Sequence, residues 1–295
     1  MRTSRLAESI VDRIENAQGL DGLAATLNSS IGKLIPSGPV EDVLSGTPIG
    51  HPAHPALVAL PIGAWSSAIA MDLAGEDDAA RRLIGLGVVT AVPAAATGAS
   101  DWLTVDGAER RVGLVHALLN YGAISLYGLS WLARGRGRRG LGIGLSAAGT
   151  AVVSAAGWLG GHMSYAQGVG VDTTVFETLP EEWTHLCAVD DLPTEGTLGR
   201  QNVDGVPILV TRRGDDVVAL TDRCTHRGAP LDEGEIKDGC VVCPWHASVF
   251  SLDDGEVRSG PATRPQTRLE SRIDNGRVQV RRRAPRTLPA RSAGA

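Results

Sequence analysis

Four long apolar stretches in the first half of the chain constrain its fold more than any other feature. They run over residues 55–73, 83–99, 113–133 and 140–160, where charged residues are sparse. Each is close to the roughly 20 residues that a helix needs to cross the hydrocarbon core of a bilayer. The second is the weakest, because Pro93 interrupts it and it is rich in alanine. Four such stretches joined by short polar loops predict a bundle of four transmembrane helices.

The chain after residue 171 has a different composition, with frequent charges and short apolar segments. The mean hydropathy of +0.01 therefore averages two unlike halves. Residues 207–211 and 216–220 are typical of apolar strands, and Gly-Asp, Asp-Gly and Asn-Gly pairs mark turns between segments. We expect an all-β domain here. The net charge of −5 gives no indication of nucleic-acid binding.

These patterns divide the chain into five segments. Residues 1–45 form an amphipathic helical segment that lacks the features of a signal peptide. Residues 46–172 form the four-helix transmembrane domain, and residues 173–182 form a linker. Residues 183–283 form the β domain, and residues 284–295 are expected to be a disordered tail. The predicted fold class is a membrane α-helical bundle followed by an all-β domain.

Arginine residues in the short loops predict the orientation of the bundle. Two loops on one side of the predicted membrane carry most of them: Arg81, Arg82, Arg134, Arg136, Arg138 and Arg139. The loop on the other side has Arg110 and Arg111. Because loops rich in Lys and Arg face the cytoplasm, we expect a multi-pass protein of the cell membrane (inner or plasma membrane). Both termini, including the β domain, would then lie outside the cytoplasm.

Four histidines are expected near one surface of the membrane: His51, His54, His116 and His162. Polar groups at membrane depth are costly and tend to be functional, and neutral imidazole is a common ligand of iron, copper and zinc. The pattern predicts a b-type haem, a second metal or a quinone site in the membrane half. His116 and His162 are the favoured ligands, because they lie within or against helices. The alternative is that these imidazoles cap helices and contact lipid headgroups.

The β domain contains two short motifs that each offer one cysteine and one histidine. They are Cys224-Thr-His226 and Cys243-Pro-Trp-His246. A [2Fe–2S] cluster needs four protein ligands, and two imidazoles in place of thiolates raise its reduction potential. A structural zinc with two Cys and two His ligands is the alternative. Zinc fingers, however, commonly pair Cys with Cys and His with His, whereas each motif here mixes them.

Residues 183 to about 283 resemble a Rieske ferredoxin domain. The match is carried by CTHRGAPL at 224–231, CPWHASVF at 243–250, DDGE at 253–256 and SGPA at 259–262. The resemblance implies an antiparallel β-sandwich with the [2Fe–2S] cluster at one tip. It also implies that the two cysteines and two histidines named above bind the cluster, with the histidine edges exposed for electron exchange.

Several positions depart from the respiratory, quinol-oxidising Rieske proteins. Those proteins have an extra cysteine in each cluster loop, joined as a disulfide, where this chain has Ala229 and Trp245. Ser248 matches their serine, but Phe250 stands where they have tyrosine. Because hydroxyl donors to the cluster raise its potential, we expect a potential between the ferredoxin and respiratory classes. Ala247 replaces the usual glycine of the second loop.

The first half resembles an uncharacterised family of four-helix bacterial membrane proteins. The match covers roughly residues 40–172 and lies in HPAHP at 51–55, LVALPIG at 57–63 and GGHMSY at 160–165, followed by GVGVD at 168–172. This resemblance implies a membrane location, but because the family is uncharacterised it implies little about function.

Together these features predict a membrane-anchored electron-transfer protein, an electron carrier or oxidoreductase subunit rather than a complete enzyme. Rieske oxygenases place catalysis in a further domain with a mononuclear iron, and we identify neither such a domain nor catalytic residues here. Electrons would pass between a haem or quinol site in the membrane half and the cluster, and on to a redox partner protein or the quinone pool. Alternatively, the helices are only an anchor or scaffold in the lipid, and the cluster serves a separate oxygenase or reductase or senses redox state. A terminal quinol-oxidising enzyme fits less well, since the disulfide is missing.

Overall fold

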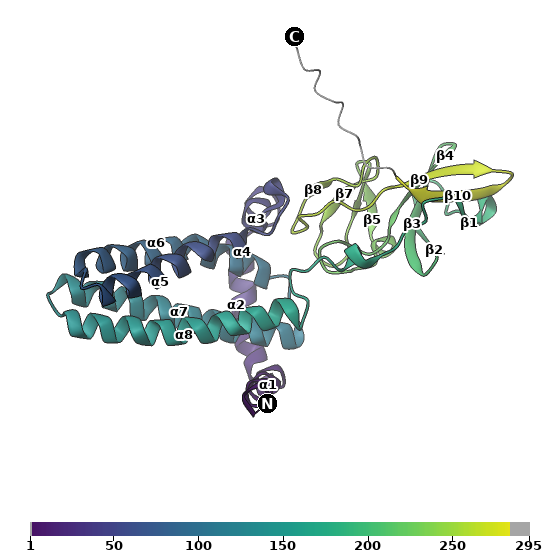
Figure 1. Cartoon of the computed structure of the whole chain (residues 1–295). Helices are drawn as coiled ribbons and strands as arrows, with labels where there is room; N and C mark the ends of the chain where they lie inside the picture. Colours follow the sequence, from purple (N-terminus) through teal and green to yellow (C-terminus); the bar gives the residue numbers. More distant parts are fainter. Residues whose placement is uncertain (1, 284–295) are drawn as a thin grey trace, which may run out of the picture. The chain divides into compact units, whose positions relative to one another are not determined.

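The computed structural model describes residues 2–283, so the predicted tail at 284–295 lies outside the described residues. The chain divides into a helical unit, which comprises the residues up to Val171 together with Ser259–Thr263, and a β unit made of the other residues from Asp172 onward. This division and the content of each unit confirm the predicted fold class (Figure 1).

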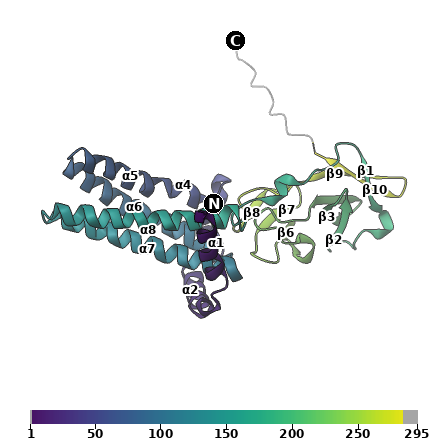
Figure 2. The ribbon, with the colours of Figure 1, turned by 60° about the horizontal axis from the view of Figure 1, so that its bottom comes forward.

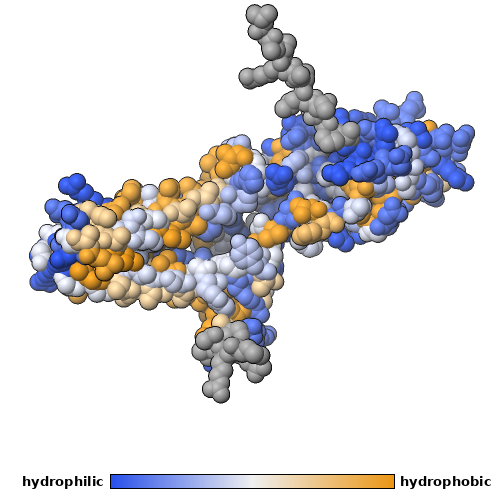
Figure 3. All heavy atoms as spheres, viewed as in Figure 1, coloured by the Kyte–Doolittle hydropathy of each residue, from blue (hydrophilic) through white to orange (hydrophobic). Residues whose placement is uncertain are grey.

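The helical unit contains a bundle of long apolar helices (Figures 1 and 2). The short helix α4 (Ala53–Leu57) leads into α5 (Ala59–Leu73), which is followed by α6 (Asp77–Trp102), α7 (Gly107–Gly135) and α8 (Arg139–Tyr165). Within residues 2–283, four helical spans are long and apolar enough to cross a membrane, with α4 and α5 counted as one. At most 33% of each apolar window is buried inside the protein. The remaining apolar surface, orange and pale in Figure 3, is suited to contact with lipid.

Helix α6 is longer than expected and runs through Pro93 without a break. The Thr97 hydroxyl donates to the carbonyl oxygens of Pro93 and Ala94, at 3.1 and 2.9 Å. Proline is tolerated within membrane helices because neighbouring helices and Ser or Thr side chains satisfy the backbone groups that it frees. The second stretch therefore forms a continuous helix that, like the other three, is long and apolar enough to cross a membrane.

Shorter helices precede the bundle and pack against its end. They are α1 (Arg2–Glu15), α2 (Asp21–Leu34) and α3 (Pro39–Ser45), with 3-10 turns at Gln18–Leu20 and Thr47–Ile49. Val11 of α1 is buried beside α7 and α8, and Ala24 of α2 is buried beside the end of α6. Ile10 and Leu23 of the same segment are instead exposed, at 47% and 48%, so only part of its apolar surface packs on the bundle.

The β unit consists of small antiparallel sheets in orders β1-β10-β9, β2-β3-β4 and β5-β6-β7-β8. The strands are β1 (Thr184–Ala188), β2 (Gly199–Val203), β3 (Val206–Arg213), β4 (Asp216–Thr221), β5 (Glu235–Lys237), β6 (Cys240–Val242), β7 (Val249–Ser251), β8 (Val257–Ser259), β9 (Leu269–Asp274) and β10 (Arg277–Arg282). Strands β3 and β4 cover the two apolar segments predicted from the sequence. Their side chains form a core with those of β1, β9 and β10.

Candidate metal centre

The two Cys-and-His motifs lie on two loops of the β unit. The first cluster loop, residues 224–229, follows strand β4, and the second cluster loop, residues 243–248, joins strands β6 and β7. The three-stranded sheet β2-β3-β4 thus positions the first loop, and the four-stranded sheet β5-β6-β7-β8 positions the second. A site built this way depends on the packing of the whole β unit.

The two cluster loops close with the same backbone hydrogen bonds. The N–H of Gly228 donates to the carbonyl oxygen of Cys224 at 2.7 Å, and the N–H of Ala247 donates to that of Cys243 at 3.1 Å. The N–H of each cysteine in turn donates to the carbonyl of the last residue of its loop, at 2.8 Å in both loops. The two loops therefore present a cysteine and a histidine on equivalent backbones.

This arrangement brings the four predicted ligand side chains together. Cys224 and Cys243 are buried, form no disulfide, and share a hydrogen bond between their thiols. The imidazoles of His226 and His246 lie edge to face, with their ring centroids 5.1 Å apart. Two thiols and two imidazoles from separate loops thus form one donor set.

The chemistry of this donor set fits a metal cluster. Within the described residues, His226 Nδ1 is buried and has no hydrogen-bond partner, although buried polar atoms are nearly always paired. Burial, with the nearby His246 and Arg227, lowers the pKa of His226 to about 3, so its imidazole is neutral and able to bind iron. The hydrogen bond between the two thiols lowers the pKa of Cys243 to about 6 and, together with burial, raises the pKa of Cys224. The thiolate that a metal needs is thus favoured at Cys243.

The grouping also suits a binuclear centre. Among residues 2–283, no three His, Cys, Asp or Glu side chains are grouped as ligands of a single ion. A structural zinc takes four ligands at one ion, whereas each iron of a Rieske-type [2Fe–2S] cluster takes two protein ligands. Two thiols and two imidazoles, which provide two ligands for each iron, match the second requirement.

The residues expected to tune the cluster lie beside the second loop. Ser248 and Phe250 are both fully buried, and Phe250 lies on strand β7 opposite Val241. Phe250 offers no hydroxyl group in that position. Ala247 has φ = +55°, the left-handed conformation that favours glycine, and the equivalent residue of the first loop, Gly228, has φ = +73°. The loop thus keeps the glycine-type conformation although alanine occupies the position.

Gln266 supports the first cluster loop and was not singled out by the sequence analysis. Its side chain is 2% exposed, and its Nε2 lies 2.6 Å from the carbonyl oxygen of Thr221 and 2.7 Å from that of Arg223. Its Oε1 accepts from the N–H of Thr225 at 3.3 Å. One amide therefore joins the end of strand β4 to the loop that carries Cys224. These partners are more than 40 residues away in sequence, so no local motif could have revealed them.

Two of the four membrane histidines, His54 and His116, have equivalent surroundings. His54 Nδ1 lies 2.9 Å from the carbonyl oxygen of Ala94 on α6. His116 Nδ1 lies 2.8 Å from the carbonyl oxygen of Ala156 on α8. Both imidazoles are half-buried.

His162 and His51 occupy different positions. His162 Nε2 lies 3.2 Å from a carboxylate oxygen of Glu15 on α1, and Gln167 donates to the same oxygen at 2.8 Å. His51 is exposed before α4. The structure therefore gives His116 and His54 equivalent surroundings, and the sequence-based preference for His116 and His162 as ligands stays a prediction.

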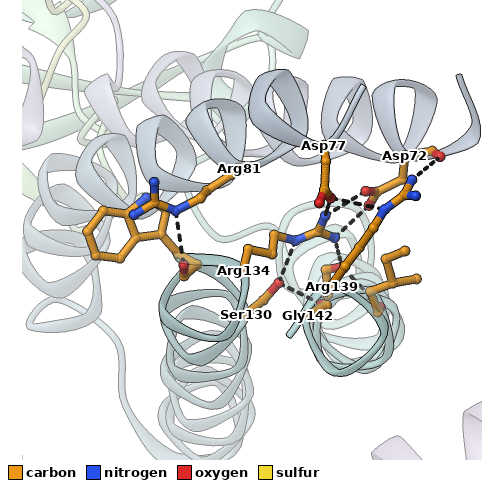
Figure 4. Close-up of polar contacts among 10 residues, drawn as sticks. Asp72, Asp77, Arg81, Ser130, Arg134, Arg139 and Gly142 are labelled. Carbon is orange, nitrogen blue, oxygen red and sulfur yellow. Dashed lines mark hydrogen bonds and ion pairs between the residues drawn. The ribbon is translucent and has the colours of Figure 1, made fainter. Parts of the chain in front are cut away.

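A buried ion-pair cluster lies at the other end of the bundle (Figure 4). The side chain of Arg134, 1% exposed, binds both carboxylate oxygens of Asp72 at 2.6 and 2.7 Å. Arg134 also contacts Asp77 at 3.1 Å and donates to the hydroxyl of Ser130 at 3.3 Å. Arg139 contacts Asp77 at 3.1 Å. Two of the arginines used to predict the orientation are thus paired with aspartates.

Comparison with known proteins assigns both halves to families. Residues 182–278 match the Rieske [2Fe-2S] domain, and residues 50–173 match the family described as predicted membrane protein (DUF2231). The anthranilate 1,2-dioxygenase ferredoxin subunit of Burkholderia cepacia is 37% identical over 99 residues, which cover 34% of this chain and 91% of that protein. Ferredoxin CarAc of Metapseudomonas resinovorans is 36% identical over 99 residues, 33% of this chain and 92% of that protein.

Among solved structures, the ferredoxin of carbazole 1,9a-dioxygenase from Nocardioides aromaticivorans IC177 matches with 26% identity and a TM-score of 0.33. The match covers 35% of this chain and 100% of that chain. The matched region of this chain covers nearly the whole length of the two ferredoxin relatives. The chain therefore belongs to the Rieske [2Fe–2S] ferredoxin family through its β unit, which follows a DUF2231 membrane domain.

Proposed function

We propose that this protein is a membrane-anchored one-electron carrier whose [2Fe–2S] cluster is bound by Cys224, His226, Cys243 and His246. The observation that carries the proposal is the convergence of two buried thiols and two imidazoles on loops with the same backbone hydrogen bonds. The cluster, when bound, supplies reversible one-electron transfer. The protein residues would hold it and bury the thiols, and burial keeps the imidazole of His226 neutral.

The second cluster loop offers a surface for a redox partner protein. Trp245 is 56% exposed, and its ring stands edge-on to that of His246, with centroids 6.4 Å apart. Aromatic side chains are enriched at protein interfaces. The relatives named as ferredoxin subunits of dioxygenases support a partner such as a terminal oxygenase. The quinone pool is the alternative exchange partner.

The four apolar helices anchor the carrier in the lipid of the cell membrane, with the β unit outside the cytoplasm. The arginine-rich loops support this orientation, and the ion pairs of Arg134 and Arg139 leave the argument intact because the rule counts Lys and Arg rather than net charge. Alkaline phosphatase and green fluorescent protein fused in turn to the C-terminus test the orientation. Active phosphatase and a dark fluorescent fusion are expected, and the reverse result would place the β unit in the cytoplasm.

Electrons pass between a haem or quinol site at the histidine-bearing end of the bundle and the cluster. Helix α8 ends at Tyr165, close to His162, so the chain leaves the bundle at that end. In the alternative function the helices are only an anchor, and soluble partners both load and unload the cluster. The rate at which a soluble quinol analogue reduces the cluster in membrane vesicles distinguishes the membrane redox site from the anchor-only function. A rate unchanged in the His54→Ala/His116→Ala double variant would favour the anchor.

The ligand assignment is tested by exchanging each histidine for cysteine. His226→Cys and His246→Cys should retain some cluster, change its electron paramagnetic resonance (EPR) signal and lower its potential, because a thiolate adds negative charge. His185→Cys is the matched control, since His185 is exposed on strand β1, and it should leave the spectrum unchanged. An unaltered signal in both His226→Cys and His246→Cys would refute the assignment.

A further inference from the structure

The membrane bundle is built from two equivalent helical hairpins, α4 to α6 and α7 to α8. Asp72 and Arg134 form an ion pair and are 62 residues apart. The same offset separates Trp65 from Tyr127, whose rings stack with centroids 4.1 Å apart and planes 7° from parallel. Residues in equivalent positions that contact each other must lie on either side of a two-fold axis. The axis therefore runs between α5 and α7, along the bundle.

The contacts around the ion-pair cluster obey the same symmetry (Figure 4). Asp77 and Arg139 share the offset and contact each other at 3.1 Å. Arg134 reaches Asp77, and in the symmetry-related contact Arg139 donates to the backbone carbonyl of Asp72 at 3.4 Å. Both hairpins turn at a glycine with positive φ, +82° at Gly75 and +71° at Gly137. The two hairpins are thus parallel repeats of one structural unit.

Few residues are identical between the repeats, and they are informative. The identical pairs between residues 54–103 and 116–165 are His54/His116, Leu57/Leu119, Ile62/Ile124, Gly75/Gly137, Leu83/Leu145, Gly87/Gly149, Ala94/Ala156 and Gly98/Gly160. Three of these pairs make one structural element: the histidine, the residue whose carbonyl binds its Nδ1, and a glycine against its ring. A β-carbon at Gly98 would lie 2.7 Å from His54 Cε1, and one at Gly160 would lie 3.0 Å from His116 Cε1.

The hydrogen bonds of the two imidazoles fix their tautomers. A carbonyl oxygen only accepts, so Nδ1 of both His54 and His116 carries the proton. Each Nε2 therefore carries a lone pair. On His116 that lone pair accepts a hydrogen bond from Asn120 Nδ2 at 3.1 Å, and a metal bound at Nε2 would replace this hydrogen bond. A histidine whose Nδ1–H donates to a backbone carbonyl is oriented as metal-binding histidines are.

We propose that His54 and His116 bind one metal centre through their Nε2 atoms, one from each repeat, and that this centre is haem iron. This inference rests on the proposed function and names its membrane redox site. Among residues 2–283 there is no third His, Cys, Asp or Glu grouped with the pair, so a bare ion would have only two of these protein ligands. Haem iron needs only two axial ligands, because the porphyrin supplies the other four. Two imidazoles related by a two-fold axis suit the two faces of that ring.

Titration of the full-length, detergent-purified protein with haemin tests the site. We expect saturable binding of one haemin per chain, with the optical spectrum of iron that has two imidazole ligands. His54→Ala and His116→Ala should each abolish that spectrum, whereas His51→Ala and His162→Ala should retain it. Gly98→Ala and Gly160→Ala displace the rings and should each weaken binding by about 10–100-fold, the range for residues that orient a metal ligand.

Further variants separate ligand loss from misfolding. His54→Met and His116→Met replace one imidazole by a thioether and should keep haem with a shifted spectrum, which an unfolded bundle would not do. Haemin binding that is absent, or equally sensitive to His51→Ala or His162→Ala, would overturn the proposal, as would Cu²⁺ binding at the pair without haemin binding. If haem binds as expected but the rate of cluster reduction does not depend on it, the proposed electron path is wrong, whereas the haem site is supported.

Discussion

The two halves of the protein hold paired histidines by different means. In the β unit, each histidine lies within three residues of a cysteine on the same loop, and backbone hydrogen bonds shape that loop. In the helical unit, each histidine is oriented by a carbonyl group 40 residues away on another helix. The first site is therefore defined by local sequence, whereas the second is defined by the packing of helices.

The two halves nevertheless share one feature, since each contains two equivalent units. The cluster loops repeat a short turn, and the membrane hairpins repeat a helical pair with the same offset throughout. In the β unit the equivalent positions have kept the same chemistry, cysteine with cysteine and histidine with histidine. At the far end of the bundle they have diverged to opposite charges, Asp72 and Asp77 against Arg134 and Arg139. The aspartates of the first hairpin therefore form ion pairs with the arginines of the second.

The largest effect on stability is expected from breaking that charge complementarity. Arg134→Ala leaves Asp72, whose side chain is 11% exposed, without its bidentate partner. Removing one partner of a buried ion pair costs about 3–5 kcal/mol. Thermal unfolding of the protein in detergent should show the loss. Because Arg134 also contacts Asp77, only the exchange of both pairs, Asp72→Arg/Asp77→Arg with Arg134→Asp/Arg139→Asp, keeps opposite charges together. That variant should recover much of the loss, and one no better than Arg134→Ala would refute the complementarity argument.

A smaller loss is expected at Gln266, where the β unit also depends on a long-range contact. Gln266→Ala leaves the carbonyls of Thr221 and Arg223 and the N–H of Thr225 without their buried partner. Unsatisfied buried groups cost about 1–3 kcal/mol. Denaturant unfolding of the cluster-loaded protein measures this, and the EPR signal reports on the first loop. Gln279→Ala, at a half-buried position of strand β10, is the control and should change both little. An equal loss in both variants would count against a specific role for Gln266.

The sequence predicted the features that depend on nearby residues and missed those that depend on distant ones. The four helical spans follow from hydropathy, and the cluster ligands follow from motifs three and four residues long. Gln266 was missed because its partners come from an earlier strand and loop. The equivalence of His54 and His116 was missed because the repeats share few residues and the relevant contacts cross between helices. The sequence analysis favoured His116 and His162 as ligands, which stays a prediction, and His162 lies beside Glu15 of α1.

The smallest effect is expected where the two cluster loops differ. Ala247 adopts φ = +55°, a conformation that costs a residue other than glycine about 1–2 kcal/mol. Ala247→Gly removes this strain but adds freedom to the unfolded chain, which offsets about 0.4–1 kcal/mol. We expect a net stabilisation of about 0.5–1 kcal/mol from these two terms.

The first loop supplies the reciprocal experiment for this prediction. Gly228 has φ = +73°, and a β-carbon there would meet no atom within 4 Å, so Gly228→Ala tests backbone strain alone. It should destabilise the β unit, while Ala247→Gly stabilises it, in urea unfolding of the cluster-loaded protein. If Ala247→Gly instead destabilises, the second loop does not have the left-handed conformation that makes it equivalent to the first. The comparison between the two loops would then hold for their ligands but not for their backbones.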